Sequence, residues 1–484
     1  MTLRITLALS LLAATPAFAQ PAAKQPAPKQ APAAKPPTAA DIANAGADDL
    51  AAFDHELDAL FSSGGLTSDQ AAARAAGASP TVRRKVAELD AAVAQADAAA
   101  LARVPQVSLK ASYTRLSPID PLIISIPGVP AIPIVTFNNA WLGEAQLVVP
   151  LSDYLLRFPK LVESADLAAR ASRLDKRANE ISAGSDARTA YYEWVRAKLQ
   201  LLIAQRQLVQ VKKTLDQERA LAEVQRVSKA DLMRVESQEA EAEQNVYMLT
   251  NIAQLREEQL RLLIGAGSEQ LVIGEDIRAD AGAPGAGQLD DLVGTAKQQR
   301  LEFQQIDAGI AAKEAQRSAE KASLYPRLSA FGIADYADPN QREFPQRDQF
   351  DLTWQVGVQA TWTLNDALNA RATDRRIAAE AAELRADKEN LERSTRLEVL
   401  QAQQAVTLAQ QSLITSQKGL SAAQESYRVR RELLAAERAT AVELVDSETE
   451  LTRARIAALN ARVDLREARA QLDHALGNDA KAAR

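Results

Sequence analysis

The feature that most constrains this chain is an internal duplication. The stretch LARVPQVSLKASYTRL at 101–116 matches ASLYPRLSAFGIADYA at 322–337, with the prolines aligned and a shift of 221. The stretch QRVSKADLMRVESQ at 225–238 matches ERATAVELVDSETE at 437–450, with a shift of 212. Self-similarity of this kind predicts two copies of one structural unit. Each element expected in the first half is therefore expected again in the second.

The duplication also divides the chain into domains. The first repeat spans 46–283, the second spans 284–477, and 478–484 form a short C-terminal tail. The shift falls from 221 to 213 between the two predicted strands of each copy. The first copy therefore has about eight extra residues in the Pro-rich loop SPIDPLIISIPGVPAIPIVTFNN at 117–139, which is not expected to be helical.

Each repeat contains a very long stretch with helical spacing of its apolar residues. Residues 156–226 and 367–437 are rich in Ala, Leu, Gln, Glu and Arg and contain one proline, Pro159. Each predicts a helix of about 70 residues, roughly 105 Å long at 1.5 Å per residue. Shorter returning helices are predicted at 230–264 and 442–476, which end at Gly265 and Gly477. No compact core can cover such helices, so they must pack on each other and on copies of the chain.

A strand pair precedes each long helix, at 104–151 and at 325–364. Apolar and polar residues alternate in 105–114, 141–149 and 350–364, whereas 327–336 alternates poorly. Alternation with period two predicts strands with one apolar and one polar face. A transmembrane barrel and a soluble sandwich with one wet face both show this pattern.

The tryptophans favour the membrane interpretation. Trp141, Trp354 and Trp362 lie in the predicted strands, and the last two are eight residues apart. At a strand tilt of about 40° this separation corresponds to roughly 20 Å along the membrane normal, close to the spacing of two aromatic girdles. Four strands cannot close a barrel, because the smallest closed ones have about eight. A trimer would supply twelve.

The N-terminus predicts export. MTLRITLALSLLAATPAFA has a basic residue, an apolar core and an A-x-A site, so we expect a signal peptide at 1–19; a short retained anchor is the alternative. The chain contains no Cys, which excludes disulfides and lipidation of an N-terminal Cys. No later stretch approaches 18 continuous apolar residues. Residues 20–45, rich in Pro, Ala and Lys, predict a disordered leader that serves as a flexible spacer.

Composition argues against several classes of function. A quarter of the residues are charged but the net charge is only −6, so there is no electrostatic case for nucleic acid. The two histidines, His55 and His474, are far apart in sequence, and neither a zinc site nor a catalytic triad is expected. The phosphate-binding motif G-x-x-x-x-G-K-[ST] is absent. We expect no enzyme, no metal and no cofactor.

The duplicated motif at 225–238 has the signature of a helix start inside a helical region. A hydroxyl residue is followed three positions later by an acid, Ser228 with Asp231 and Thr440 with Glu443. Such a pair caps a helix, because the hydroxyl accepts from an unpaired N–H and the acid lies at the positive helix end. The chain is therefore predicted to reverse direction at both places.

Together these stretches resemble the TolC-like outer-membrane efflux proteins, over about 66–477. The matching stretches are ASPTVRRKVAELDAAVAQADAAALARVPQVSLKASYT, SLYPRLSAFG, VVPLSDYLLR, RVSKADLMRVESQEAEAE and ESYRVRRELLAAERATAVELVDSETEL, with the two glycines that end the returning helices. The resemblance implies an α+β membrane protein. It implies a homotrimer, a twelve-stranded β-barrel surrounded by outer-membrane lipid, and a long α-helical coiled-coil barrel in the periplasm.

The resemblance also implies a function. It is that of a passive exit duct of a tripartite efflux pump or a type I secretion system. The partners would be a periplasmic adaptor (membrane fusion protein) and an inner-membrane transporter that supplies the energy. A soluble periplasmic coiled-coil adaptor or scaffold is the alternative. Drugs, metal ions and polypeptides would all fit as cargo.

By resemblance, the two capped turns are the periplasmic tips that contact the adaptor; the alternative is that both motifs only cap the helices. The residues concerned are Gln225, Arg226, Val227, Ser228, Lys229, Asp231, Glu437, Arg438, Ala439, Thr440 and Glu443. The family usually has Gly where Gln225 and Glu437 stand. Acidic gate rings of the best-known member correspond here to positions near Arg428 and Arg431. The hypothesis is a constriction that is not acidic and is weakly blocked by cations; solvated arginines are the alternative.

Overall fold

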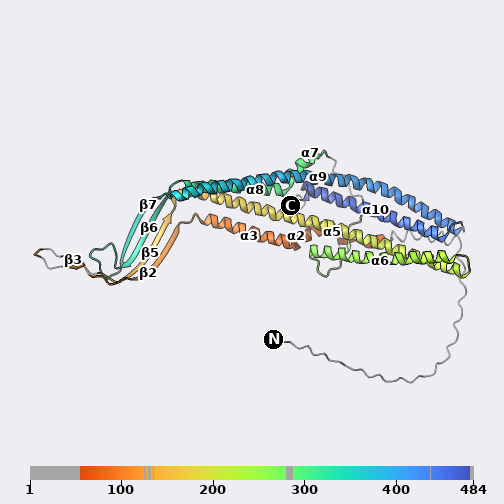
Figure 1. The fold of residues 1–484 in the computed structure, drawn as a ribbon, viewed down its shortest axis with the longest axis horizontal. Coiled ribbons are helices and arrows are strands. Elements are labelled where there is room, and N and C mark those ends of the chain that lie inside the picture. The colour runs from red at the N-terminus through yellow and green to blue at the C-terminus, as the bar shows by residue number, and fades with distance from the viewer. Residues whose placement is uncertain are drawn as a thin grey trace, which may run out of the picture.

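A computed structural model of the chain describes residues 55–120, 122–124, 127–128, 132–134, 136–279, 287–436 and 438–479. The predicted signal peptide (1–19), the leader (20–45), Glu437 and the tail beyond Asp479 lie outside these residues. The described part is an elongated molecule with a β-sheet at one end and long helices that extend away from it (Figure 1).

Residues 55–60 are helical and lead into the short strand β1 (Phe61–Leu66). The first repeat then contains α2 (Ser68–Ala78), α3 (Pro80–Leu101), β2 (Gln106–Arg115), β3 (Leu122–Ile124), β4 (Ile132–Ile134), β5 (Asn139–Val149), α4 (Leu151–Leu156), α5 (Phe158–Glu223) and α6 (Lys229–Ile264). The second contains α7 (Leu289–Gln299), α8 (Leu301–Lys321), a 3-10 turn η1 (Ala322–Leu324), β6 (Arg327–Asp338), β7 (Asp351–Thr361), α9 (Leu364–Ala435) and α10 (Ala441–Leu476). The predicted strand pairs, long helices and returning helices are confirmed.

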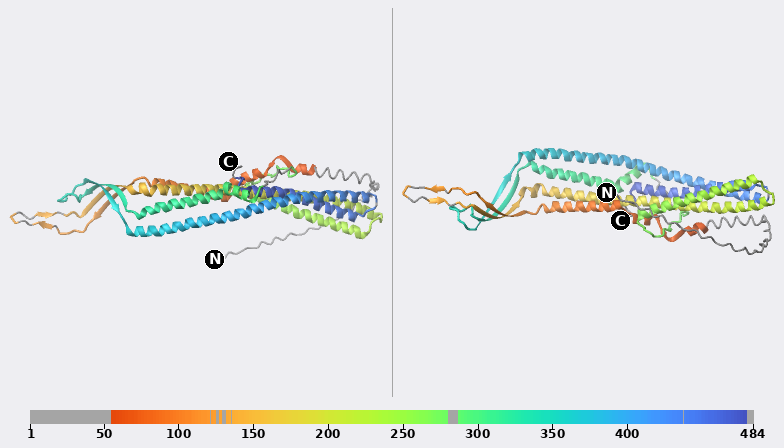
Figure 2. Two further views of the ribbon diagram at one scale, coloured as in Figure 1. Left: turned by 90° about the horizontal axis from the view of Figure 1, so that it is seen from above. Right: turned by 60° about the horizontal axis from the view of Figure 1, so that its bottom comes forward.

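The elements form four parallel columns that run the length of the molecule. The main sheet has the order β2-β5-β6-β7, and all its neighbours are antiparallel. Near the sheet the helices are packed in the order α3-α5-α8-α9, and farther away in the order α6-α5-α10-α9. Figures 1 and 2 show the result, in which α3 and α6 follow one another in one column and α8 and α10 in another. The wall is open, and its two free sides are the β2-α3-α6 column and the β7-α9 column.

Left-handed glycines end the two returning helices. Gly265 (φ 65°) and Gly477 (φ 75°) close α6 and α10 at equivalent positions of the two repeats. A Cβ at Gly477 would lie 3.0 Å from the backbone nitrogen of Arg300, so this residue must be small as well as left-handed. The repeat thus places the same stop signal at the end of both hairpins.

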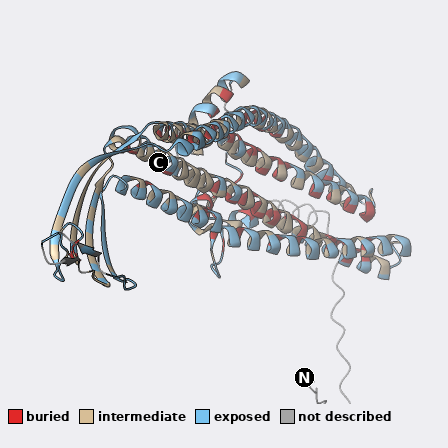
Figure 3. Cartoon of the chain, turned by 60° about the vertical axis from the view of Figure 1, so that its left-hand side comes forward, coloured by how far each residue is buried: buried red, intermediate tan, exposed pale blue. Residues whose placement is uncertain are grey.

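The apolar core lies midway along the helices. Tyr191, Trp194 and Leu199 of α5 are almost fully buried against the 271–277 loop, α2, and parts of α6 and α10. A second cluster joins α7, α9 and α10 around Val399. Figure 3 shows that buried residues gather in these middle and lower parts of the helices, whereas the sheet has few.

Ion pairs run along the contact between α8 and the part of α9 nearer the sheet. Cross-helix ion pairs link α7, α8 and the connection between them to α9: Asp290–Arg396, Lys297–Glu392, Arg300–Glu398, Asp307–Lys388, Glu314–Arg385, Lys313–Glu380, Arg317–Asp374 and Lys321–Asp374. We call this set the α8–α9 charge ladder. Below Glu398, α9 packs along α10 instead.

The 117–139 loop contains regular structure that the sequence did not predict. It contains the β3–β4 hairpin, in which Leu122 pairs with Ile134 and Ile124 with Ile132. In Figure 1 this hairpin projects beyond the main sheet. The prediction of four strands describes the main sheet and misses this hairpin and β1, because prolines near both hairpin strands hide the pattern.

Candidate functional site: the helix turns and the sheet faces

Two backbone hydrogen bonds define the first helix turn, which follows α5. The N–H of Arg226 donates to the carbonyl of Leu221 at 3.0 Å, and that of Gln225 donates to Ala222 at 3.0 Å. These two bonds define a Schellman motif, which needs a left-handed residue at its centre. Gln225 is that residue, with φ 59°. The turn therefore has the geometry that glycine would suit, although glutamine occupies it.

The second turn repeats the same geometry. The N–H of Arg438 donates to the carbonyl of Leu433 at 2.8 Å, which is the counterpart in the second repeat of the bond between Arg226 and Leu221. Glu437, which stands where Gln225 stands in the first turn, is outside the described residues.

Both returning helices are capped as the sequence predicted. Ser228 accepts from the backbone N–H of Asp231 at 3.1 Å, and Thr440 accepts from that of Glu443 at 3.3 Å. The Ser228 hydroxyl also donates to the Asp231 carboxylate at 2.6 Å. Arg226, Lys229, Arg438 and Thr440 are exposed around these caps, whereas Val227 and Ala439 are partly covered. The turns thus present a polar, rigid surface at the end of the molecule farthest from the sheet (Figure 1).

Three described contacts tie the two hairpins together near their turns. Arg234 of α6 approaches Asp446 of α10, with Nη2 and Oδ2 3.5 Å apart, and Gln238 donates to the same carboxylate at 3.4 Å. Farther from the turns, the Gln210 amide donates to the Tyr427 hydroxyl at 3.4 Å, which links α5 to α9. All three are polar side-chain contacts, and they add to the packing of α5 along α10.

The proposed gate positions carry more negative charge than the sequence analysis assumed. Arg428 is paired with Glu425 and Glu432 on its own helix, each at 2.6 Å. Two carboxylates around one guanidinium give this cluster a net negative charge. Arg431 lies 5.9 Å from the centre of the Tyr427 ring. The hypothesis of a constriction that is not acidic stays a prediction.

A carboxyl group is buried close to the first turn. Glu218 of α5 is only 4% exposed. Burial, followed by the charge of Asp231, raises the pKa of Glu218 above its ordinary value. The end of the helical wall therefore contains an acid that is held where its charged form is disfavoured.

The two faces of the main sheet differ sharply. One face carries large apolar residues that are strongly exposed, and the other carries polar residues that are more shielded. We call them the apolar face and the polar face. On the apolar face Leu109 is 81% exposed, Val356 73% and Leu352 69%. Water-exposed apolar residues beside shielded polar ones are the reverse of a soluble sheet.

Aromatic residues lie at both ends of the apolar face. Tyr113 and Trp141 are paired across β2 and β5, with ring centres 4.5 Å apart, at the end nearest the β3–β4 hairpin. Trp362 and Tyr325 lie at the opposite end, beside the helices, and both are exposed. The register places Trp354 four residues inward from the level of Trp141, so it lies within the apolar face and not at its outer edge. Sequence reasoning singled out the tryptophans and missed the tyrosines.

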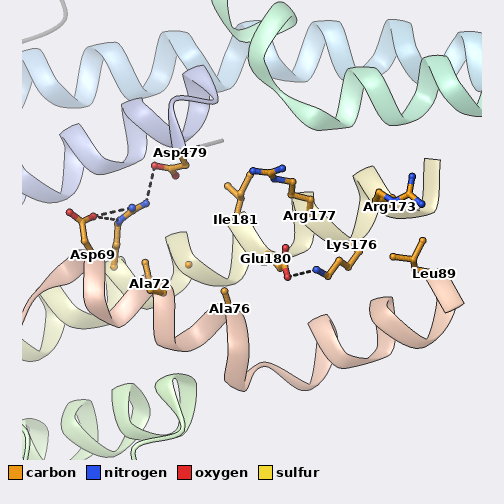
Figure 4. A pocket seen from close by; sticks show the side chains of 13 residues that line it. Asp69, Ala72, Ala76, Leu89, Arg173, Lys176, Arg177, Glu180, Ile181 and Asp479 are labelled. Atoms are coloured by element: carbon orange, nitrogen blue, oxygen red, sulfur yellow. Dashed lines mark hydrogen bonds and ion pairs between the residues drawn. The ribbon is translucent and has the colours of Figure 1, made fainter. Parts of the chain in front are cut away.

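A groove with a volume of 880 Å³ lies between α2, α3 and α5 at mid-height. In it Arg188 pairs with Asp69 at 3.0 Å and with Asp479 at 2.9 Å, and Figure 4 shows how these pairs join α2 and α5 to the C-terminal end of the described chain. His474 lies 3.2 Å from the same Asp479 carboxylate. The groove is lined by paired charges that fasten elements together. Among the described residues no cluster of His, Cys, Asp or Glu is arranged to hold a metal ion.

No helix in the described part of the chain combines the length and the apolar character that crossing a membrane requires.

Comparison with known proteins identifies the family. The model of the outer membrane efflux protein family matches residues 71–266 and 292–478, one segment in each repeat. The starts of the two segments are offset by 221 and their ends by 212, the same shifts that the duplication shows. The chain belongs to the outer membrane efflux protein family, and the resemblance seen in the sequence is confirmed. No curated protein matches the sequence.

Solved structures show the same fold at low sequence identity. The outer-membrane channel OprN has a TM-score of 0.68 at 20% identity, covering 86% of this chain and 94% of its own. The outer membrane protein VceC from Vibrio cholerae has a TM-score of 0.68 at 16% identity, covering 85% and 96%. The open MtrE channel from Neisseria gonorrhoeae has a TM-score of 0.68 at 17% identity, covering 85% and 88%. The family and these folds support an efflux channel of the outer membrane, and nothing described favours a soluble scaffold.

Proposed function

We propose that three copies of this chain close into a tube that conducts cargo passively across the outer membrane. The proposal rests on one observation: the strands of the sheet and the helices that continue from them lie in the same order across one open wall. The sheet has free edges at β2 and β7, and the helical layer has free sides at α3/α6 and α9, so both layers are open along the same two columns. A tube closes when the β7-α9 column of one copy meets the β2-α3-α6 column of the next.

The free sides carry exposed apolar residues that a neighbouring copy would cover. On α6, Met248, Ile252, Leu255 and Leu262 are exposed at spacings of four, three and seven residues, which places them on one helix face. On α9, Leu397 and Leu408 are exposed and eleven residues apart, also on one face. Contact between these two stripes would bury both and would remove the unpaired strand edges.

Three copies supply twelve strands, enough to close a transmembrane barrel with the apolar face toward lipid and the polar face toward the lumen. The greater exposure of the apolar face supports this orientation. The helical part would then extend into the periplasm as a coiled-coil barrel, and the aromatic residues would lie at the two membrane interfaces. Removal of residues 1–19 would yield a mature chain that is not lipidated, because it has no cysteine.

The polar turns would contact a periplasmic adaptor that couples the tube to an inner-membrane transporter. Their exposure and rigid capping support this role for Ser228, Lys229, Thr440 and their neighbours. The gate would lie above the turns, near Arg428 and Arg431, and would open when the two hairpins separate.

Two measurements test the proposal. Purified full-length protein in detergent is expected to have the mass of a trimer and to form conducting pores in planar bilayers. A monomer that partitions into the aqueous phase and forms no pores would reject it. Because the chain lacks cysteine, Lys229→Cys gives a single attachment site for a photo-crosslinker. In cells it is expected to capture the adaptor, whereas Arg84→Cys on the exposed surface of α3 is not.

A further inference from the structure

We infer that the barrel lumen selects organic cations with an apolar body over organic anions. This inference rests on the proposed function, because it requires the polar face of the main sheet to line the lumen. The register of the four strands places an acidic band across that face, and two apolar residues of β6, Ile333 and Phe331, lie beside it; we call these two residues the apolar band.

The acidic band lies in the outer half of the sheet. Lys110, Glu144, Asp335 and Thr353 form one row across β2, β5, β6 and β7, each directly opposite the next. Asp351 lies one position farther out on the same face, opposite Ala337. Three carboxylates against one ammonium give the band a net charge of −2 in each chain, and −6 in a trimer.

These charges are only partly compensated within the described part of the chain, where the Gln349 amide donates to Asp351 and the charge of Arg347 acts on it. None of Lys110, Glu144, Asp335 and Asp351 takes part in a salt bridge there. One carboxylate oxygen of Asp335 and one of Asp351 are shielded from solvent and accept no hydrogen bond. Glu144 faces Lys110 on one side and Asp335 on the other, so the sheet only partly offsets the like-charge repulsion between Glu144 and Asp335. A cation in the lumen would relieve that repulsion.

The apolar band lies directly below, toward the helices. Ile333 is two residues from Asp335 on the same face of β6, and Phe331 follows it. The Phe331 ring lies over Gly357 of β7, where an added Cβ would be only 2.8 Å from its Cζ. The glycine therefore makes room for an aromatic side chain on the face that is otherwise polar. This placement of Phe331 and Ile333 is also why β6 alternates poorly in sequence.

A negative band next to an aromatic one suits a molecule with a positive group and an apolar body. The carboxylates would attract the cation through the low-dielectric barrel wall, and the Phe331 ring would contact its apolar part. An anion of the same size would meet the same apolar band and be repelled by the acidic one.

The experiment measures bi-ionic reversal potentials with full-length trimer in planar bilayers. The probes are benzyltrimethylammonium and benzylsulfonate, which share a benzyl group and carry opposite fixed charges. The wild type is expected to favour the cation. The double variant Glu144→Gln/Asp335→Asn is expected to lower the cation-to-anion permeability ratio at least about threefold. Asp338→Asn, which removes a carboxylate on the apolar face of β6, is the matched control and is expected to leave the ratio unchanged.

The apolar band is tested separately with tetramethylammonium, which has the same cationic group without the ring. Phe331→Ser is expected to lower the permeability of benzyltrimethylammonium relative to tetramethylammonium and to leave the preference for cation over anion intact. Trimer mass confirms that each variant has assembled. Pores whose ratio is the same in the wild type and the double variant would overturn the inference and leave the proposed function standing. Failure of the wild type to form pores would count against both.

Discussion

Arg234 and Asp446 occupy equivalent positions in the two repeats, and they contact each other across the wall at 3.5 Å. Equivalent positions of a duplicated unit meet only where they lie close to the local axis that relates the copies. The contact joins α6 to α10 at the same level of both repeats, six residues beyond the caps Ser228 and Thr440.

Loss of this contact is expected to ease separation of the hairpins without unfolding them. Both side chains are more than half exposed, so Asp446→Asn should change the free energy of unfolding by less than about 0.5 kcal/mol. The open probability of single pores in planar bilayers should nevertheless rise. The charge-swapped variant Arg234→Asp/Asp446→Arg should restore the wild-type value. An open probability that is equal in all three proteins would contradict this role.

The helix caps are expected to contribute to stability by comparable amounts. Ser228→Ala and Thr440→Ala each leave a backbone N–H without its side-chain acceptor, at a cost of about 1 kcal/mol. Urea unfolding of the purified protein, followed by helical circular dichroism, measures the loss. Ser228→Thr keeps an acceptor and should lose less than half as much. Equal losses for Ala and Thr would show that the cap bond is not the cause.

Replacing Gln225 with glycine is expected to increase the stability of the protein. A side chain in the left-handed region costs about 1 kcal/mol, and glycine avoids that cost while losing some unfolded-state entropy. Gln225→Gly should therefore raise the free energy of unfolding by about 0.5 kcal/mol, and Gln225→Val should lower it by more than about 1 kcal/mol. Thermal unfolding of the two variants side by side provides the measurement. Destabilisation by glycine would show that the Gln225 side chain has a role that outweighs its backbone cost.

The buried Glu218 gives the turn region a pH dependence of defined sign. Because burial raises its pKa, the folded state binds a proton more readily than the unfolded state, and stability rises as the pH falls through that raised pKa. Glu218→Gln should stabilise the protein by about 1 kcal/mol at pH 8, and its advantage should shrink as the medium is acidified. Unfolding at pH 8 and pH 5 measures the difference. The exposed Glu223→Gln should show no such trend.

Periodicity predicted the regular elements well because each has a strong local signal. Stretches almost free of proline indicated the long helices, and the hydroxyl–acid pairs that begin at Ser228 and Thr440 located the turns. Local signals failed where a distant residue decides the outcome. The register puts Phe331 on the polar face, and its ring fits there because Gly357, on the next strand, leaves room for it, which no window within β6 reveals.

The candidate site shows the same limit. The tryptophans were found by residue type, but the height of each one along the sheet depends on strand register, which places Trp354 within the apolar face and not at its edge. Arg428 was interpreted as a basic gate position, although Glu425 and Glu432 lie three and four residues away and both pair with it. Helical spacing alone could have found that cluster, because neighbours at three and four residues share a helix face.

The α8–α9 charge ladder covers only the part of α9 nearer the sheet and leaves the rest of the described helix without such ion pairs. Every ion pair that joins α9 to α7, to α8 or to the connection between them in the described residues lies at or before Glu398. The part of α9 from there to Ala435 is a rod of about 55 Å at 1.5 Å per residue. A rod of that length multiplies displacement, because a rotation of about 10° at its root moves its end by about 10 Å. If α9 and α10 turn together at the ladder, a small change of angle halfway along the molecule becomes a large movement at the turns.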